Sequence, residues 1–276
     1  MLTQTFVHIR GISHATERKL WNAGVLSWED LLAAGPRRLG PCRTPEVLRE
    51  VEASFAALTA QDWRFFLTRL RPADQVRLFP HVRDQIAYVD IETTGLRRPA
   101  VITAIAIYDG FEHKSYVRGE NLDQFPRDLA AYRVLVTYNG KRFDLPFLER
   151  EFGMRFPHPH IDLRHVMRSW GLTGGLKECE RRLGIKRQVP EEMDGHLAVI
   201  LWHYYMRFGD ERALRLLTAY NIQDVLSLEL LMTEAYNRSM QWHPSAIRLS
   251  VPQQPQLRGV PDLAELREAL HAAWDV

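Results

Sequence analysis

The sequence predicts an α/β fold in which a mixed five-stranded sheet is flanked by helices and preceded by a small all-helical N-terminal section. Runs of apolar and β-branched residues recur at strand length after residue 84, and the first three follow closely enough to pair as an antiparallel meander. The fourth run leads directly into a helical pattern, DLPFLEREFG, and the chain after the fifth is mostly helical in its periodicity. The predicted strands span 85–92, 101–109, 113–119, 134–139 and 160–163.

The other elements follow from capping and breaking signals. GISHATERKLWNAGV predicts a helix closed by Gly24, Ser27 is placed to cap the next one, and Pro45 opens a longer one. We expect a connector over 71–80 and a long helical section over 211–237. The tail begins as a proline-rich extended stretch and ends in a helix. The helical N-terminal section, the α/β region and the tail are expected to span 1–80, 84–237 and 238–276.

Composition and charge define the class of protein. The chain has 276 residues, 46% of them hydrophobic and 25% charged, which is typical of a folded globular protein with a large core. A net charge of +2 and a pI near 8.6 neither indicate nor exclude a nucleic-acid partner. Two cysteines without a C-x-x-C spacing exclude a disulfide framework and a thiolate zinc site. Because no leader-like or membrane-length apolar run is present, we expect a soluble cytoplasmic protein with no membrane partner.

The stretch AYVDIETTGL, residues 87–96, places acidic side chains on a predicted buried strand. Because side chains alternate between the two faces of a strand, Asp90 and Glu92 point the same way. Burying two like charges side by side costs several kcal/mol unless cations neutralise them. The pair therefore predicts a metal ion or a basic ligand, and the alternative is that one of them pairs with a core arginine.

Two further segments carry acids that the fold does not require. Asp144 follows the fourth predicted strand in YNGKRFDLPFL, and Tyr220 and Asp224 are four residues apart in YNIQDV, so they share one helix face. Each has an ordinary explanation, because Asp144 stands where a helix N-cap belongs and a Tyr-x-x-x-Asp pair is common on solvated helix faces. Together with Asp90 and Glu92, these residues could bring four carboxylates and one phenol to a single site.

The motifs DIETTG, YNGKRFD and YNIQD, in this order and at these intervals, resemble the three exonuclease motifs of the DEDD superfamily of 3′-5′ exonucleases, which has a ribonuclease H-like fold. The Tyr-x-x-x-Asp form of the last motif resembles the tyrosine (DEDDy) branch, as in proofreading domains of family B DNA polymerases. More narrowly, GISHATERKLWNAGV, and IDL, LKECERRLGI and DGHLAVILWHYY between the second and third motifs, resemble bacterial YprB-like ribonuclease H-like proteins. The resemblance covers the α/β region well and the N-terminal section more loosely.

The resemblance implies a site and a reaction. Asp90, Glu92, Asp144 and Asp224 would be the metal ligands, and Tyr220 would orient the attacking water. The ligand chemistry agrees, because oxygen ligands without His or Cys suit two Mg²⁺ or Mn²⁺ ions, which activate water and stabilise the leaving oxygen of a phosphodiester. The implied activity is metal-dependent hydrolysis of single-stranded DNA or RNA from its 3′ end to nucleoside 5′-monophosphates.

Residues beside the acids are candidates for contact with the substrate. By the resemblance, the backbone after the first motif lies against the terminal nucleotide and Leu96 wedges against the last base, although TTG is also an ordinary turn with Gly at positive φ. Asn139 and Asn221 are expected to support the ligands or position the substrate, and Lys141 with Arg142 to contact phosphate. The predicted substrate-binding set is Thr93, Thr94, Gly95, Leu96, Asn139, Lys141, Arg142 and Asn221.

The N-terminal stretch and the type of activity leave alternatives open. RGISHATERKLWNAGV resembles a degenerate helix-hairpin-helix, with Ser13-His14 in place of the second hairpin glycine, so it either binds the nucleic-acid backbone or serves as a scaffold. A nucleic-acid-binding module with little turnover and a structure-specific endonuclease are the alternative functions. Both DNA and RNA fit the motifs, and the sequence identifies no protein partner.

Overall fold

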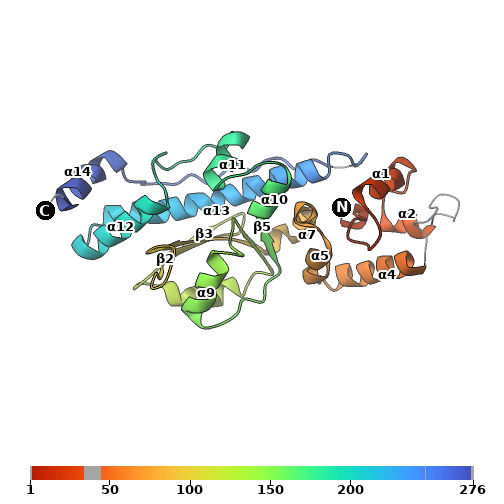
Figure 1. Cartoon of the computed structure of the whole chain (residues 1–276), viewed down its shortest axis with the longest axis horizontal. Coiled ribbons are helices and arrows are strands. Elements are labelled where there is room, and N and C mark those ends of the chain that lie inside the picture. The colour runs from red at the N-terminus through yellow and green to blue at the C-terminus, as the bar shows by residue number, and fades with distance from the viewer. Residues whose placement is uncertain (1, 34–44, 246, 275–276) are drawn as a thin grey trace.

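A mixed five-stranded sheet forms the centre of the molecule in the computed structural model, which describes residues 2–33, 45–245 and 247–274. The strands are β1 (Ile86–Thr93), β2 (Ile102–Tyr108), β3 (His113–Val117), β4 (Val134–Thr137) and β5 (His160–Asp162). Their order across the sheet is β3-β2-β1-β4-β5, and Figure 1 shows the sheet at the middle of the molecule. β2 pairs antiparallel with β1 and β3, whereas β4 pairs parallel with β1 and β5, so the predicted mixed α/β fold is confirmed.

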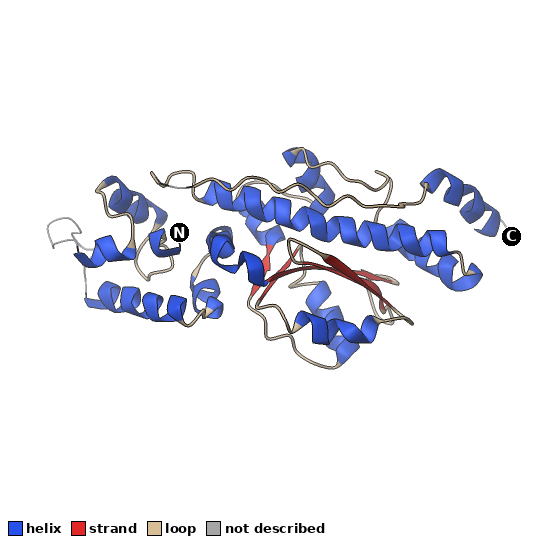
Figure 2. Ribbon diagram, turned by 180° about the vertical axis from the view of Figure 1, so that it is seen from behind, coloured by secondary structure: helices blue, strands red, loops and turns tan. Residues whose placement is uncertain are grey.

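Helices cover both faces of the sheet. α13 (Glu211–Ser239) runs across one face, and α8 (Phe125–Leu129) and α9 (Asp144–Phe152) lie on the other (Figures 1 and 2). β1 serves both layers because its side chains alternate, with Tyr88 in the core on the α13 side and Val89 in the core that includes α8 and α9. The remaining elements after β3 are η5 (Leu122–Gln124), α10 (Leu163–Ser169), α11 (Leu176–Leu183), α12 (Gly195–Phe208) and α14 (Leu263–Trp274).

The N-terminal section consists of helices at one end of the molecule (Figure 1). Ser13 caps the first of them by accepting a hydrogen bond from the Thr16 amide at 3.2 Å. The stretch 71–80 was predicted to be a connector but forms three helical turns, because Pro72 and Pro80 each stand in a first turn, where an N–H is not needed. The elements are η1 (Leu2–Gln4), α1 (His14–Asn22), α2 (Trp28–Ala33), α4 (Pro45–Thr59), α5 (Trp63–Arg69), α6 (Pro72–Gln75), η3 (Val76–Leu78), α7 (Phe79–Val82) and η4 (Arg83–Gln85).

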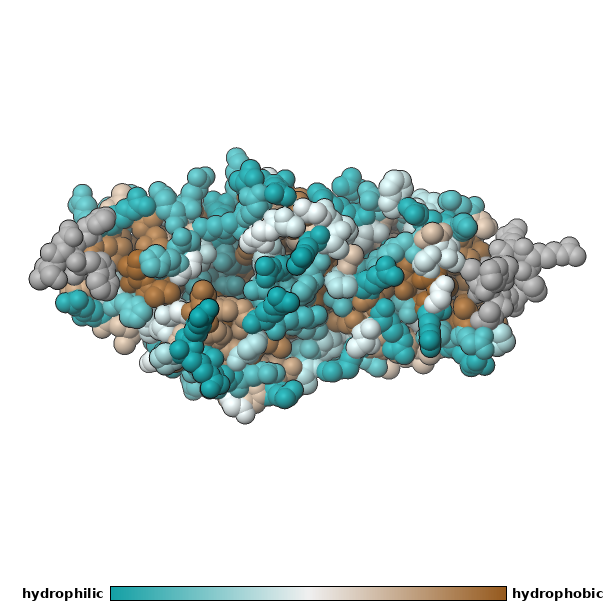
Figure 3. Space-filling view, viewed as in Figure 1, coloured by the Kyte–Doolittle hydropathy of each residue, from teal (hydrophilic) through white to brown (hydrophobic). Residues whose placement is uncertain are grey.

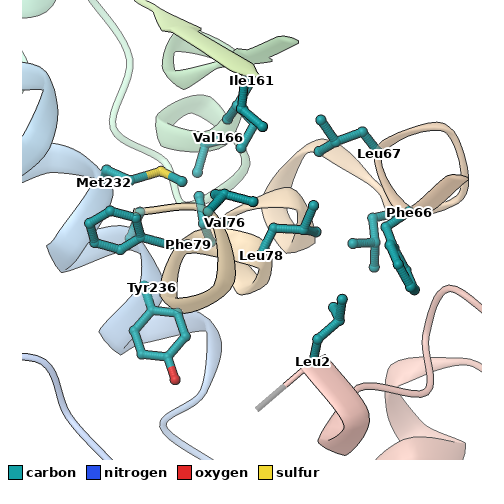
Figure 4. Close-up of a cluster of buried hydrophobic side chains, with 14 of the residues drawn as sticks. Leu2, Phe66, Leu67, Val76, Leu78, Phe79, Ile161, Val166, Met232 and Tyr236 are labelled. Atoms are coloured by element: carbon teal, nitrogen blue, oxygen red, sulfur yellow. The ribbon is translucent and has the colours of Figure 1, made fainter. Parts of the chain in front are cut away.

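One hydrophobic core runs through the N-terminal section and the sheet region. Figure 4 shows Leu2 and Phe66 on one side of Leu78 and Phe79, with Met232 of α13 on the other. These side chains are all buried and belong to one continuous cluster. The core therefore crosses the boundary that the sequence predicts between 80 and 84, and the helical section is packed directly against the α/β region.

The tail returns along α13, and it has the extended stretch and the helix that the sequence predicts. Residues 247–260 are extended and lead into α14 (Figure 2). The side chain of Asn237 on α13 exchanges two hydrogen bonds with the Leu249 backbone, at 2.8 and 2.9 Å. Hydrophilic residues cover most of the face shown in Figure 3, with apolar residues in separate patches. Among the residues that the structure describes, no helix is long and apolar enough to span a bilayer.

Candidate active site

β1 carries two acidic side chains on the sheet face that α13 covers. In the register with β2, Asp90 lies opposite Ala106 and Glu92 lies opposite Ala104. These small neighbours leave room for two carboxylates beneath the helix. Asp90 is half-buried and Glu92 is 8% exposed. The prediction that both acids share one face of a buried strand is confirmed.

α13 brings three polar side chains to the same place. Asn221 donates a hydrogen bond from Nδ2 to Oδ2 of Asp90 at 2.7 Å. The carboxylate oxygens of Asp90, Glu92 and Asp224 lie within 4.8 Å of one another. Tyr220, one turn before Asp224, is 7% exposed, so the Tyr-x-x-x-Asp pair is buried and is not a solvated helix face.

Asp144 adds a fourth carboxylate from the other side of β1. It is the first residue of α9, with Phe143 in the capping position, so the N-cap alternative does not apply. The backbone amides of Asp144 and Ile91 lower the pKa of this carboxyl group and oppose part of the effect of burial. Among the described residues its Oδ1 is buried without a hydrogen-bond partner, and Asp144 lies outside the group of three whose oxygens are within 4.8 Å.

The electrostatics of the site are those of a crowded acidic cluster. Burial raises the pKa of Asp90 and of Glu92 well above the ordinary range, and the charges of Asp224 and Asp144 raise both further. Burial also raises the pKa of Asp144 to about 7 and that of Asp224 to about 6. Without a bound cation, such a cluster keeps protons that isolated carboxyl groups would lose at neutral pH.

A buried phenol lies beside the carboxylates. Burial raises the pKa of Tyr220 above its usual value, and the charges of Asp224 and Glu92 raise it further. The Nζ of Lys177 lies 5.6 Å from the centroid of the tyrosine ring, and the guanidinium carbon of Arg187 lies 5.2 Å from it. The phenol therefore keeps its proton at neutral pH and can donate a hydrogen bond there, but it cannot act as a base.

The loop that precedes Asp144 is held by an acid that the sequence analysis did not identify. The buried carboxylate of Asp162, at the end of β5, accepts hydrogen bonds from the amides of Asn139 at 2.8 Å and Lys141 at 3.1 Å. Asn139 has a φ of 69°, and a Cβ on Gly140 would lie 2.2 Å from Oγ1 of Thr137. The tight turn therefore requires a glycine at position 140. The turn determines where α9 begins and so where Asp144 lies.

Residues 87–236, more than half of the chain, match a family model described as the RNase_H superfamily. The chain belongs to the RNase H superfamily. A protein of Bacillus subtilis (strain 168) named "Uncharacterized protein YprB" is 29% identical to it over 170 residues, which covers 53% of this chain and 40% of that protein. The chain thus spans well under two thirds of that relative's length. No solved structure matches the chain significantly.

The RNase H-like fold typically uses divalent metal ions. The donor set fits such ions, because its members are carboxylate oxygens without His or Cys, as Mg²⁺ and Mn²⁺ prefer. The unpartnered Oδ1 of Asp144 is a further oxygen available beside the group of three. The RNase H fold thus gathers a group that could bind metal at Asp90, Glu92 and Asp224.

The predicted substrate-contacting residues differ in their exposure and in their hydrogen bonds. Oγ1 of Thr93 donates to the Gly95 carbonyl at 2.7 Å, and Oγ1 of Thr94 accepts from the Val101 amide at 3.0 Å, so TTG is an ordered turn. Gly95 has a φ of 156°, and Leu96 is 80% exposed. Three more positions lie near the second motif. Lys141 and Arg142 are exposed, whereas the side chain of Asn139 accepts from Arg164 at 2.6 Å.

The sequence analysis missed three charged residues at this site: Asp162, Glu180 and Arg187. Nη2 of Arg187 donates to Oδ1 of Asp224, so the arginine predicted as an alternative partner exists but reaches a different acid of the cluster. Asp162 could have been found, because it lies at the end of a predicted strand, and the carboxyl ends of the parallel strands β4 and β5 meet at one edge of the sheet. Arg187 had none, since it stands in a loop without periodicity between α11 and α12.

Proposed function

We propose that the protein is a metal-dependent 3′-5′ exonuclease that hydrolyses single-stranded nucleic acid to nucleoside 5′-monophosphates. The observation that carries this proposal is the convergence of the Asp90, Glu92 and Asp224 carboxylates beside Asp144 and the buried Tyr220 phenol in a member of a nucleic-acid hydrolase superfamily. A surplus of buried acid with a protonated phenol beside it suits the hydrolysis of a phosphodiester.

Each residue has a role in this proposal. Asp90, Glu92, Asp144 and Asp224 hold two divalent ions, which would supply water activation and charge neutralisation at the leaving oxygen. Tyr220 keeps its proton and donates it in a hydrogen bond that orients the attacking water. Asn221 acts indirectly, because its hydrogen bond to Asp90 fixes the orientation of that carboxylate.

An exposed apolar residue close to Glu92 in the sequence supports the proposal that the substrate is a chain end. Leu96 is a large apolar side chain that is 80% exposed only four residues after Glu92. We propose that Leu96 stacks on the terminal base while the turn from Thr93 to Gly95 lies against the terminal sugar. Lys141 and Arg142, exposed beside the second motif, would contact the phosphates that follow.

The test is hydrolysis of matched 5′-labelled single-stranded DNA and RNA in Mn²⁺, Mg²⁺ or EDTA, each with a 3′-blocked and a circular copy. We expect a metal-dependent ladder from the open 3′ end, no product from the blocked or circular strands, and none in EDTA. Asp123→Asn, at an exposed acid in η5, is the matched control and should keep wild-type activity.

The other outcomes would replace the proposal. Cleavage of circular strands would make the protein an endonuclease. If the protein bound the strands without metal ions and released no products, it would be a nucleic-acid-binding module.

A further inference from the structure

An arginine joins the acidic cluster to a second buried carboxylate. The Arg187 side chain is 10% exposed, and its Nη1 donates to both carboxylate oxygens of Glu180, at 2.9 and 2.8 Å. Its Nη2 donates to Oδ1 of Asp224. Glu180 is buried on α11, and within the described ranges every hydrogen bond to its carboxylate comes from Arg187. The guanidinium is therefore shared unequally, with two bonds to Glu180 and one to Asp224.

The backbone beside this arginine is fixed, so the side chain is the part that can move. The Gln188 amide donates to Oε1 of Gln223 on α13 at 2.8 Å. The Gln188 side chain binds the tail on both sides, through the Pro255 carbonyl at 2.9 Å and the Leu257 amide at 3.0 Å. The tail thus supports the loop that presents the arginine to the cluster.

Asp224 belongs to two sets of contacts that compete with one another. Its carboxylate is one of the three that can hold a metal ion, and it is also the acceptor for Nη2 of Arg187. A guanidinium and a divalent cation on one buried carboxylate repel each other strongly, because little water screens them. Binding of a metal ion at Asp224 therefore disfavours that contact with the arginine.

We propose that Arg187 is an internal counter-ion that competes with the metal ion for Asp224, and that Glu180 retains the guanidinium when the metal ion binds. This inference rests on the proposed function in one respect only, that Asp224 is a metal ligand. In the metal-free protein the arginine neutralises part of the acidic cluster. Glu180 gives the displaced guanidinium a partner, so a buried cation is never left alone.

The test is titration of Mn²⁺ into metal-free protein without nucleic acid, with free Mn²⁺ followed by electron paramagnetic resonance. Glu180→Gln leaves the guanidinium with Asp224 as its remaining carboxylate, so Mn²⁺ should bind about tenfold more weakly. The double variant Arg187→Met/Glu180→Gln removes the competitor without a change in net charge, so Mn²⁺ should bind about tenfold more tightly. If Arg187 only supported Asp224, both variants would bind more weakly.

A control separates this effect from a general loss of charge. Glu178→Gln, on the same helix, removes an acid that pairs with Arg181 and Arg182 at the surface, and it should change Mn²⁺ affinity less than about twofold. Thermal unfolding in EDTA reports whether each variant is folded. A double variant that is folded and binds Mn²⁺ no more tightly than the wild type would overturn the inference.

The outcomes for the two proposals are distinct. Mn²⁺ binding that follows the expected opposite signs, with no hydrolysis of any strand, would support the counter-ion and disprove the exonuclease. Hydrolysis from the 3′ end, with Mn²⁺ affinities of the variants that do not change in opposite directions, would support the exonuclease and disprove the counter-ion. Failure of wild-type protein to bind Mn²⁺ would overturn both.

Discussion

Two buried groups of charged side chains in this protein differ in their charge balance. In the N-terminal section, Nη1 of Arg77 donates to both oxygens of Glu17 at 2.9 Å, and its Nη2 lies 3.1 Å from Asp74. His14 hydrogen-bonds the same aspartate, and the Phe6 amide donates to Glu17 at 2.7 Å. Arg77 contacts both carboxylates of this group, and the group links α1 to the turns before the sheet.

The group between β1 and α13 is built from similar side chains but has a surplus of acid. Four carboxylates gather there, and Arg187 neutralises one of them while it also serves Glu180. The comparison shows what burial of a charge means in this fold. An arginine that contacts both neighbouring carboxylates holds elements together, whereas a larger excess of buried acid can bind a cation.

The largest expected effect is on the rate of hydrolysis and comes from the acidic cluster between β1 and α13. Asp90→Asn should lower the rate of hydrolysis at least about ten-thousandfold, or about 5.5 kcal/mol, because it removes a proposed metal ligand. Thermal unfolding in EDTA should show no loss of stability, since the change also removes repulsion within the acidic cluster. A folded variant with full activity in Mg²⁺ or Mn²⁺ would contradict the assignment of Asp90.

The next effect is in stability and belongs to the N-terminal group. Arg77→Met should lower the free energy of unfolding by about 3–5 kcal/mol, because it leaves Glu17 and Asp74 buried without their cation. Urea unfolding measures this loss, and Arg18→Met, at an exposed arginine of α1, should leave stability within about 0.5 kcal/mol of the wild type. A loss for Arg77→Met no greater than that control would mean that the group is not structural.

Local periodicity explains what could be predicted from the sequence. Strand alternation fixed the shared face of Asp90 and Glu92, and helical spacing fixed that of Tyr220 and Asp224, because both patterns extend over a few residues. The contact between Arg187 and Asp224 joins residues 37 positions apart through a loop, and no local pattern encodes it. For the same reason the turns at 71–80 were missed, since their apolar side chains are explained by a core shared with α13.

The pH dependence of stability in metal-free protein should show that a carboxyl group of the acidic cluster is protonated in the folded state. Burial raises the pKa of Asp144 from 3.8 to about 7, so its stabilising contribution is complete below pH about 4 and is lost as the pH rises to about 7. Urea unfolding in EDTA should therefore show lower stability at pH 8 than at pH 5. Asp144→Asn should reduce this loss by roughly 2 kcal/mol. An identical loss in the variant would show that Asp144 is not protonated in the folded protein.

The smallest expected effect concerns Tyr220, which lies where the cations and the acidic cluster meet. Its ring is close to Lys177 and Arg187, yet burial and the nearby carboxylates dominate and raise the pKa of the phenol. Tyr220→Phe should therefore lower kcat about tenfold with little change in KM, because the lost hydrogen bond orients water chiefly in the transition state. The pH–rate profile should keep its shape, since the phenol does not titrate between pH 6 and 9. If the variant loses one limb of that profile, the phenol acts as a base, and the cations then lower its pKa more than burial raises it.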